Sequence, residues 1–311
     1  MGTILFTPRP KTGSISITKV ITDTPSDETF FHVTVTGQAA EPTIVDGYVS
    51  QQEPLRFDGL PFDTYVITED SQEGYVFGSI ISDTVVLSRS NRNESVVVTN
   101  DKMEEIKYGL LYNWYAANDV RNITNTGWSL PSKSNYEVLS TFLGGNLISG
   151  DKLKESGTIY WNTPNSGNNS SNFNGRGAGL RNELGQFHAI KINGYTWTST
   201  EMTLSIAYIF QLIYNASTGL TTGGQDKKYG SPIRLIKIST TLSDGEEGIY
   251  TGNDGKIYRT ICIGTQEWLA DNLAETKYRN GDTIPEVTDN SAWAALTTGA
   301  MCVYNNDHNN I

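Results

Sequence analysis

Apolar and polar side chains alternate in short runs through the first hundred residues. Residues 14–20 and 31–36 place apolar side chains on one face of an extended chain. This period of two predicts strands with one buried face. Further strands are expected at 64–69, 84–87 and 95–100. Short strands separated by turn residues predict a β-sandwich over residues 13–100, preceded by an N-terminal arm at 1–12.

The pattern changes after a short polar linker at 101–106. Aromatic-rich segments and Asn/Gly loops replace the regular strands, and two helices are expected. The first follows Ser132 as N-cap, with Tyr136, Leu139 and Leu143 on one face, and stops at the glycines that follow. The second spans about 291–297, capped by Asp289 or Asn290, with Trp293 and Leu296 directed inward. The predicted fold class is therefore mainly β, a sandwich followed by an α+β domain.

Composition narrows the classes of function. The 311 residues suggest two domains, and the net charge of −11 argues against a nucleic-acid or anionic-membrane partner. No apolar run approaches the ~18 residues that a spanning helix needs, so membrane insertion is not expected. The opening residues lack a secretory signal, and if residue 1 is the true start, we expect no ordinary secretory export. Cys262 and Cys302 have no metal-like spacing and are expected to be buried free thiols.

Three polar residues interrupt the strand pattern, namely Lys19, Glu69 and Asn100. The segment around them resembles the Cna-B or SpaA-type prealbumin-like domains of bacterial surface proteins, through residues 17–20, 57–69, 73–75 and 97–100. The resemblance implies an internal isopeptide bond with Lys19 as nucleophile, Asn100 as acceptor and Glu69 as acid/base. Burial of Lys19 would favour the isopeptide bond, because desolvation lowers the pKa of a lysine and a neutral amine is the nucleophile. The alternative is an ordinary Lys19–Glu69 ion pair, with Asn100 capping a strand.

The later region resembles the Fibrobacter succinogenes major paralogous domain, a C-type-lectin-like module of surface proteins of gut bacteria and their phages. The opening half of that pattern is found at 254–258, 263–273, 277–278, 281–285, Trp293 and 304–307. The closing half is found at 108–116, 127–131, 152–154, 161–162, 179–181, 197–201 and 233–234.

Each half occurs once, in reversed order. We interpret residues 107–311 as one circularly permuted module, with the closing half at 107–238, a bridge at 239–248 and the opening half at 249–311. Two separate incomplete copies would each expose unpaired backbone groups at the cut. This interpretation places Ile311 close to Lys107 and Tyr108. The alternative is an exchange of halves between neighbouring subunits.

Catalysis is not expected. Fold relatives of the lectin-like module include the formylglycine-generating enzymes, which use reactive cysteines in a cleft, but Cys262 and Cys302 lie in apolar, strand-like settings and no nucleophile–base pair is evident. No cofactor is expected. Calcium is the alternative, because residues 162–165 and 305–307 offer the oxygen ligands that it prefers, although Asn-rich loops more often form turns.

Recognition without a metal is the third possibility. In related modules the stretch before the last strand is exposed, and it corresponds here to residues 201–229. Tyr and Asn suit adaptable recognition, whereas alternation of Tyr208, Phe210 and Leu212 favours a core face for part of the segment. The predicted binding surface comprises Glu201, Met202, Leu204, Tyr208, Phe210, Gln211, Tyr214, Asn215, Lys227 and Lys228.

Together these features predict a non-enzymatic virion surface protein, such as a head fibre, capsid decoration or tail-associated adhesin. The N-terminal domain would dock on other virion proteins, the lectin-like domain would meet a host glycan or protein, and a homo-oligomer is expected. The alternatives are a structural decoration protein without a ligand and a bacterial cell-surface adhesin.

Overall fold

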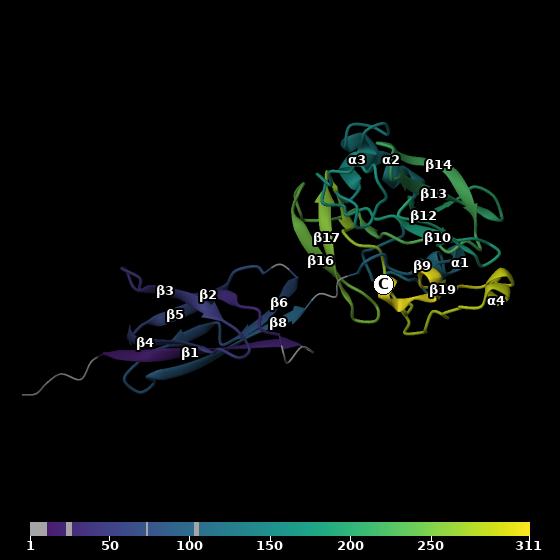
Figure 1. The fold of residues 1–311 in the computed structure, drawn as a ribbon. Coiled ribbons are helices and arrows are strands. Elements are labelled where there is room, and N and C mark those ends of the chain that lie inside the picture. The colour runs from purple at the N-terminus through teal and green to yellow at the C-terminus, as the bar shows by residue number, and fades with distance from the viewer. Residues whose placement is uncertain (1–10, 23–26, 73, 103–105) are drawn as a thin grey trace, which may run out of the picture. The chain divides into compact units, whose positions relative to one another are not determined.

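The chain folds into two compact units, Met1–Glu104 and Glu105–Ile311 (Figure 1). The computed structural model describes residues 11–22, 27–72, 74–102 and 106–311. Most of the predicted arm at 1–12 and the middle of the linker at 101–106 therefore lie outside the described residues. The fold is mainly β, as the alternating pattern predicts.

The first unit is a sandwich of two four-stranded sheets, ordered β4-β1-β8-β6 and β3-β2-β5-β7. β1 and β8 run parallel, and the other neighbours pair antiparallel. The sheets enclose one apolar core, to which β1 contributes Ile15 and Ile17 and β8 contributes Val96 and Val98. The strands are β1 (Thr12–Thr22), β2 (Phe31–Gly37), β3 (Ile44–Val49), β4 (Leu55–Pro61), β5 (Thr64–Glu69), β6 (Tyr75–Ile81), β7 (Thr84–Val86) and β8 (Asn93–Lys102).

All five predicted strands of this unit are present, as β1, β2, β5, β7 and β8. The sequence did not indicate β3, β4 and β6, and each of these lies at an edge of its sheet. β3 directs Ile44 and Tyr48 outward, 60% and 63% exposed, while Val45 and Val49 face the core, so apolar residues lie on both faces and the alternation of apolar and polar positions is lost. An edge strand has one neighbour, and its weaker packing leaves a weaker pattern in the sequence.

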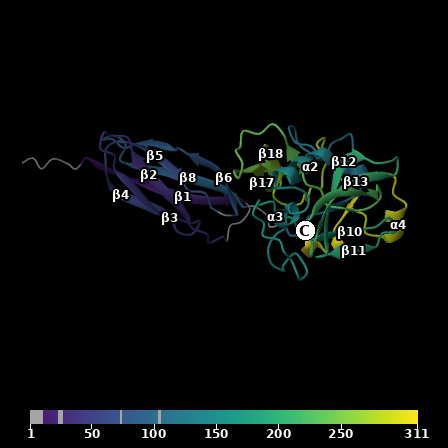
Figure 2. The same cartoon turned by 90° about the horizontal axis from the view of Figure 1, so that it is seen from above.

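The second unit contains a five-stranded sheet, a four-stranded sheet and a two-stranded pair. Figures 1 and 2 show the two larger sheets at different sides of this unit. The five-stranded sheet is ordered β11 (Phe187–Ile190), β10 (Ala178–Arg181), β12 (Asn193–Glu201), β13 (Ile206–Ile213) and β14 (Gly219–Asp226). The four-stranded sheet is ordered β15 (Ile236–Lys237), β18 (Gln266–Leu269), β17 (Ile257–Ile263) and β16 (Glu247–Thr251).

The helices of this unit are short. They are α1 (Trp114–Ala117), α2 (Lys133–Phe142), α3 (Ser149–Leu153), α4 (Asn290–Ala294), η1 (Tyr304–Asn306) and η2 (His308–Asn310). Ser132 caps α2 in a capping box with Asn135, as the sequence indicates for the start of this helix. Asp289 caps α4, which ends at Ala294 and is shorter than predicted. Among the described residues, no helix has the length and apolar character that crossing a membrane requires.

Segments from both ends of the second unit are joined by backbone hydrogen bonds. β9 (Leu111–Tyr112) pairs with β19 (Met301–Cys302), and the labels of the two strands lie together in Figure 1. The N–H of Lys107 donates to the carbonyl of Ile311 at 3.0 Å, and the N–H of Tyr108 donates to Asn310 at 3.2 Å. The expected proximity of Ile311 to Lys107 and Tyr108 is therefore confirmed, within a single chain.

Candidate functional site

Three polar side chains project into the apolar core of the first unit. Lys19 continues the inward series of Ile15 and Ile17 on β1, and Asn100 continues the inward series of β8. Since β1 and β8 are neighbours in one sheet, Lys19 and Asn100 come together from sequence positions 81 apart. Glu69 ends β5 in the opposite sheet. The residues at which the sequence predicts cross-link chemistry therefore meet between the two sheets.

The three side chains form a closed ring of hydrogen bonds. Lys19 Nζ donates to Asn100 Oδ1 at 2.6 Å and also to Glu69 Oε2. Asn100 Nδ2 donates to Glu69 Oε1 at 2.8 Å. The side chains of Lys19 and Glu69 are 0% and 1% exposed, and Asn100 is 2% exposed. The amine, the carboxamide and the carboxyl group are thus held together away from water.

The environment of Lys19 favours loss of its proton. Burial lowers the pKa of the Lys19 ammonium below its ordinary value, although the hydrogen bond and the charge of Glu69 act in the opposite direction. The ring of Phe31 packs against the amine, with Nζ 3.7 Å from the ring centroid. Phe31 in turn packs edge-on against Tyr75, with ring centroids 5.0 Å apart. The aromatic side chain covers the amine and holds it against the carboxamide.

Phe31 was not singled out from the sequence. It was expected only as an apolar residue opening a strand, and nothing in the pattern distinguishes it from the other inward residues of β2. Its role depends on the pairing of β2 with β5, which aligns Val33 with Glu69. Only the assembled sheet therefore shows which aromatic ring lies over Lys19.

The predicted binding surface of the second unit is divided between exposed and buried residues. Met202 and Leu204 are 40% and 96% exposed. Glu201 and Asn215 are also exposed, whereas Tyr208, Gln211, Tyr214 and Lys228 are half-buried. The exposed members lie mainly in the turn between β12 and β13.

Phe210 and Lys227 require a correction, because both are buried. Phe210 stacks on Tyr136 with ring centroids 4.4 Å apart. Lys227 lies 4.3 Å from the Trp114 ring centroid and pairs with Glu201 at 3.1 Å. Neither Phe210 nor Lys227 is available to a ligand at this surface.

Phe210 lies on a strand that is buried on both faces. Ala207 and Ile209 belong to one apolar core cluster, whereas Phe210 and Leu212 belong to another, so consecutive residues of β13 are buried on opposite faces. Tyr208 and Phe210 share a face, because both lie against α2, Tyr208 near Lys133 and Phe210 on Tyr136. The alternation that favoured a core face for part of the segment therefore holds for Phe210 and Leu212, and the assignment of Phe210 to the binding surface was wrong.

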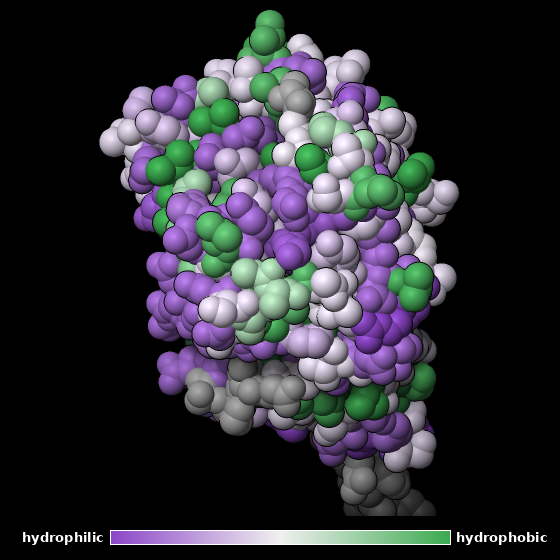
Figure 3. Space-filling model, turned by 90° about the vertical axis from the view of Figure 1, so that its right-hand side faces the viewer, coloured by the Kyte–Doolittle hydropathy of each residue, from purple (hydrophilic) through white to green (hydrophobic). Residues whose placement is uncertain are grey.

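The outer surface of the second unit is mixed in character. Figure 3 shows hydrophilic and hydrophobic residues interspersed on the face where β14 and α4 lie, without one large apolar area among the described residues. Small separated apolar groups of this kind are ordinary for a protein surface.

The cysteines are buried free thiols, as expected. Burial raises the pKa of the Cys302 thiol to about 12 and also raises that of Cys262. Asp307, from the Asn-rich segment considered for calcium, accepts from the N–H of Asn309 and caps η2. Within the part of the chain that the structure describes, no group of three or more His, Cys, Asp and Glu residues is arranged to hold a metal ion.

Comparison with known families assigns this chain to one of them. The family model described as the Fibrobacter succinogenes major domain matches residues 71–237. This match covers more than half of the chain, which belongs to this family. The match begins within the first unit, before the predicted boundary at residue 107, and ends one residue before the end of the predicted closing half, so residues 1–70 and 238–311 lie outside it. No match was found among curated proteins.

Several solved structures match parts of the chain. The backbone protein of pilus 2b from group B streptococcus is 16% identical over 29% of this chain and 41% of that protein, with a TM-score of 0.24. The major pilin SpaD from Corynebacterium diphtheriae is 14% identical over 36% of this chain and 34% of the pilin, with a TM-score of 0.24. An adhesin from Mobiluncus mulieris, described as containing disulfide, isopeptide and ester bond cross-links, is 21% identical over 30% of this chain and 41% of the adhesin, with a TM-score of 0.21. The chain thus spans less than half the length of these proteins.

Proposed function

We propose that the first unit closes an isopeptide bond between Lys19 and Asn100, and that the chain is a non-enzymatic surface protein with a structural or adhesive role. The observation that carries the proposal is the buried ring of Lys19, Glu69 and Asn100. An ion pair alone would need no carboxamide in contact with both partners. Here Asn100 presents its oxygen to the amine and its nitrogen to the carboxyl group.

The proposed reaction exchanges one amide for another. Neutral Lys19 Nζ attacks Cγ of Asn100, forming the new C–N bond, and the bond from Cγ to Nδ2 breaks. Glu69 supplies a proton to the departing Nδ2 and receives one from Nζ, so it ends in its original protonation state. Ammonia leaves, and no oxidant or cofactor is consumed.

The bond would suit a protein exposed to tension and proteases. Lys19 and Asn100 lie on β1 and β8, the first and last strands of the sandwich, which run parallel. Tension between the two ends of this unit would shear these strands past each other, and a covalent bond between them would keep the intervening chain folded. Unlike a disulfide, such a cross-link forms without a redox partner. The two cysteines of the chain, Cys262 and Cys302, are both free and form no disulfide.

The setting we propose is the surface of a virion, with a bacterial cell surface as the alternative. In either setting the first unit would dock on neighbouring structural proteins, and the second unit, in a homo-oligomer, would be displayed towards a host glycan or protein. We further propose that residues 107–311 form a circularly permuted, C-type-lectin-like module. The contacts of Lys107 and Tyr108 with Ile311 and Asn310 support a continuous module in one chain.

Intact-mass spectrometry of the denatured full chain tests the cross-link. The wild-type protein is expected to be lighter than its sequence mass by one ammonia molecule, and the lost mass should map to a branched peptide that joins Lys19 to Asn100. Glu69→Gln, which keeps the side-chain shape but removes the carboxyl group, should show the full sequence mass. A wild-type protein of unreduced mass would overturn the proposed bond.

Localisation tests the setting separately. Proteomic analysis of purified virus particles and of peptides released by protease from intact cells should detect the chain in one of the two preparations. Recovery only from the soluble cell interior would contradict both surface roles, even if the cross-link forms.

A further inference from the structure

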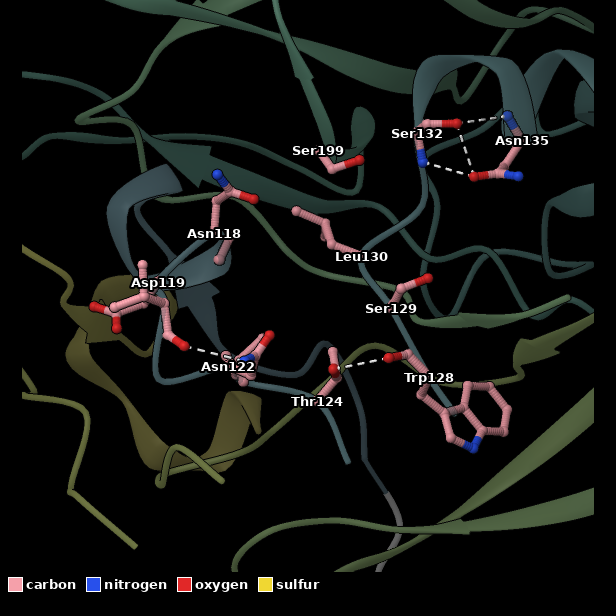
Figure 4. Close-up of a pocket in the computed structure, with 13 residues that line it drawn as sticks. Asn118, Asp119, Asn122, Thr124, Trp128, Ser129, Leu130, Ser132, Asn135 and Ser199 are labelled. Atoms are coloured by element: carbon pink, nitrogen blue, oxygen red, sulfur yellow. Dashed lines mark hydrogen bonds between the residues drawn. The ribbon is translucent and has the colours of Figure 1, made fainter. Parts of the chain in front are cut away.

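A second site lies in the second unit, away from the predicted binding surface at 201–229. A cavity of about 600 Å³ opens between the loop that follows α1 and the segment leading into α2, with Ser199 of β12 at its wall (Figure 4). The volume falls within the range of about 300–1,000 Å³ that is usual for small-molecule sites. Figure 4 shows Asn118, Leu130 and Ser199 turned towards the same space.

The wall of this cavity carries hydrogen-bonding groups that make no side-chain hydrogen bond with other described residues. They are the carboxamide of Asn118, the hydroxyls of Ser129 and Ser199, and the Nδ2 of Asn135, whose Oδ1 is already bound by Ser132. Buried Leu130 contributes an apolar surface between them, and the half-buried Trp128 lies at the edge. Donors and acceptors are therefore mixed around a small apolar floor.

The cavity is close to neutral. Asp119 is the one ionisable residue among those that line it. Arg121 binds both carboxylate oxygens of Asp119, with Nε and Nη2 each at 2.9 Å, and this interaction lowers the pKa of Asp119. A ligand here would meet a neutralised ion pair and uncharged amide and hydroxyl groups.

We propose that this cavity binds a neutral saccharide. A sugar hydroxyl both donates and accepts, and it therefore matches hydroxyl and carboxamide groups that also do both. The apolar C–H faces of a sugar ring suit the surface of Leu130. The inference deepens the display role proposed above and rests on it for a biological setting, but it does not depend on the cross-link.

Other ligand classes fit less well. An anionic glycan or nucleotide needs a cation directed at it. Beside the wall, Arg121 pairs with Asp119, Lys237 pairs with Glu267, and Arg279 donates to Thr124. A peptide strand would need an open sheet edge, whereas most of this wall is formed by loops and helix ends. An apolar ligand would leave the polar groups of the wall unpaired.

The experiment uses the full chain and an array of neutral, sialylated and sulfated glycans, followed by calorimetric titration with the neutral oligosaccharide that binds best. The test variant is Asn118→Ala with Ser199→Ala, which removes two unpartnered polar groups and should leave the fold intact, as tryptophan fluorescence would check. The matched control is Asn215→Ala with Ser205→Ala, the same chemical change at exposed positions in the segment 201–229.

Neutral glycans are expected to bind the wild-type chain and the control equally. The test variant should bind about tenfold or more weakly, the loss expected for two hydrogen bonds. Since the wall is neutral, raising the salt concentration should change the affinity little. Binding that is lost in the control but kept in the test variant would assign recognition to the segment 201–229 and overturn the proposal. Binding of only anionic glycans, or of no glycan by a correctly folded chain, would overturn it as well, whatever the intact mass shows.

Discussion

Arg234 donates from its Nε to Oδ1 of Asn272 at 2.8 Å, although the two residues lie 38 positions apart. The same guanidinium donates to the carbonyl oxygens of Phe173, Asn174 and Leu269. Arg234 is 0% exposed, and burial lowers its pKa to about 10. One buried cation, with charge retained at neutral pH, therefore ties the 107–238 segment to the 249–311 segment.

Arg234→Met should destabilise the second unit strongly. It leaves four acceptors without their donor, three of them buried, and the free energy of unfolding is expected to fall by about 3–5 kcal/mol. All six tryptophans lie in this unit, so their fluorescence in urea follows its unfolding alone. Arg259→Met is the matched control, since its side chain is 35% exposed and meets Asp271 at 3.6 Å. Its effect should stay below about 1 kcal/mol, and equal losses in the two variants would contradict the argument.

Glu275 should make the stability of the second unit depend on pH. Burial raises the pKa of the Glu275 carboxyl to about 7, and the charge of nearby Asp254 acts in the same direction. The Tyr258 hydroxyl and the N–H of Asp254 both bind this carboxyl, at 3.0 and 3.1 Å. In an unfolded chain a glutamate has a pKa of about 4.3. Between about pH 4.5 and 7 the folded protein thus keeps a proton that the unfolded chain has lost.

The protonated Glu275 carboxyl contributes fully to the stability of the second unit below about pH 4.5, and this contribution is lost as the pH rises to about 7. The loss of stability amounts to about 4 kcal/mol at most. Glu275→Gln preserves the shape of the neutral acid. In this variant the free energy of unfolding should change little between about pH 4.5 and 7. Urea unfolding followed by tryptophan fluorescence from pH 4.5 to 8 measures the slope. An identical slope in the wild type and in Glu275→Gln would show that Glu275 does not titrate in this window.

The cross-link residues were predicted from the resemblance to prealbumin-like domains, and strand parity agrees with the direction in which they point. Lys19 lies two and four residues after Ile17 and Ile15, and Asn100 lies two residues after Val98. Residues an even number of positions apart share one face of a strand, so Lys19 and Asn100 face the core with these apolar residues. The position of Phe31 over Lys19 could not be predicted, because it depends on the pairing of strands distant in sequence. The cavity beside Asn118 and Ser199 was missed for the same reason, since loops from separate parts of the chain form its wall.

Phe210 and Tyr208 test how deeply the face of β13 that lies against α2 is buried. Phe210 is buried against Tyr136, whereas Tyr208 is half-buried, with Lys133 Nζ 4.7 Å from its ring centroid. Phe210→Ala should lower the free energy of unfolding by about 3–5 kcal/mol because it opens a cavity in the core. Tyr208→Ala should cost about 1 kcal/mol. Urea unfolding compares them directly, and a larger loss in Tyr208→Ala than in Phe210→Ala would contradict the deeper burial of Phe210 on this face.

The Lys19–Asn100 bond should dominate the stability of the first unit. Closing a loop of 81 positions removes chain entropy from the unfolded state, worth about 4.5 kcal/mol on the model used for disulfides. The variant to compare is the double substitution Lys19→Met with Glu69→Gln. It prevents the bond and replaces the buried ion pair with neutral groups of similar shape, which by itself is often close to neutral in stability. The difference from the wild type therefore isolates the cross-link.

Scanning calorimetry of the full chain should show two transitions, one of which coincides with the change in tryptophan fluorescence and belongs to the second unit. The other transition is expected to fall by about 20 °C or more in the double variant. Asn100→Ala is the second comparison: it also lacks the bond but leaves Lys19 and Glu69 paired without the carboxamide, so it should melt no higher than the double variant. If the first unit melts at the same temperature in the double variant and in the wild type, although the wild type has lost the mass of ammonia, the bond forms but does not raise the thermal stability of the sandwich. In that case resistance to pulling and to proteases, rather than thermal stability, is the property that the cross-link supplies.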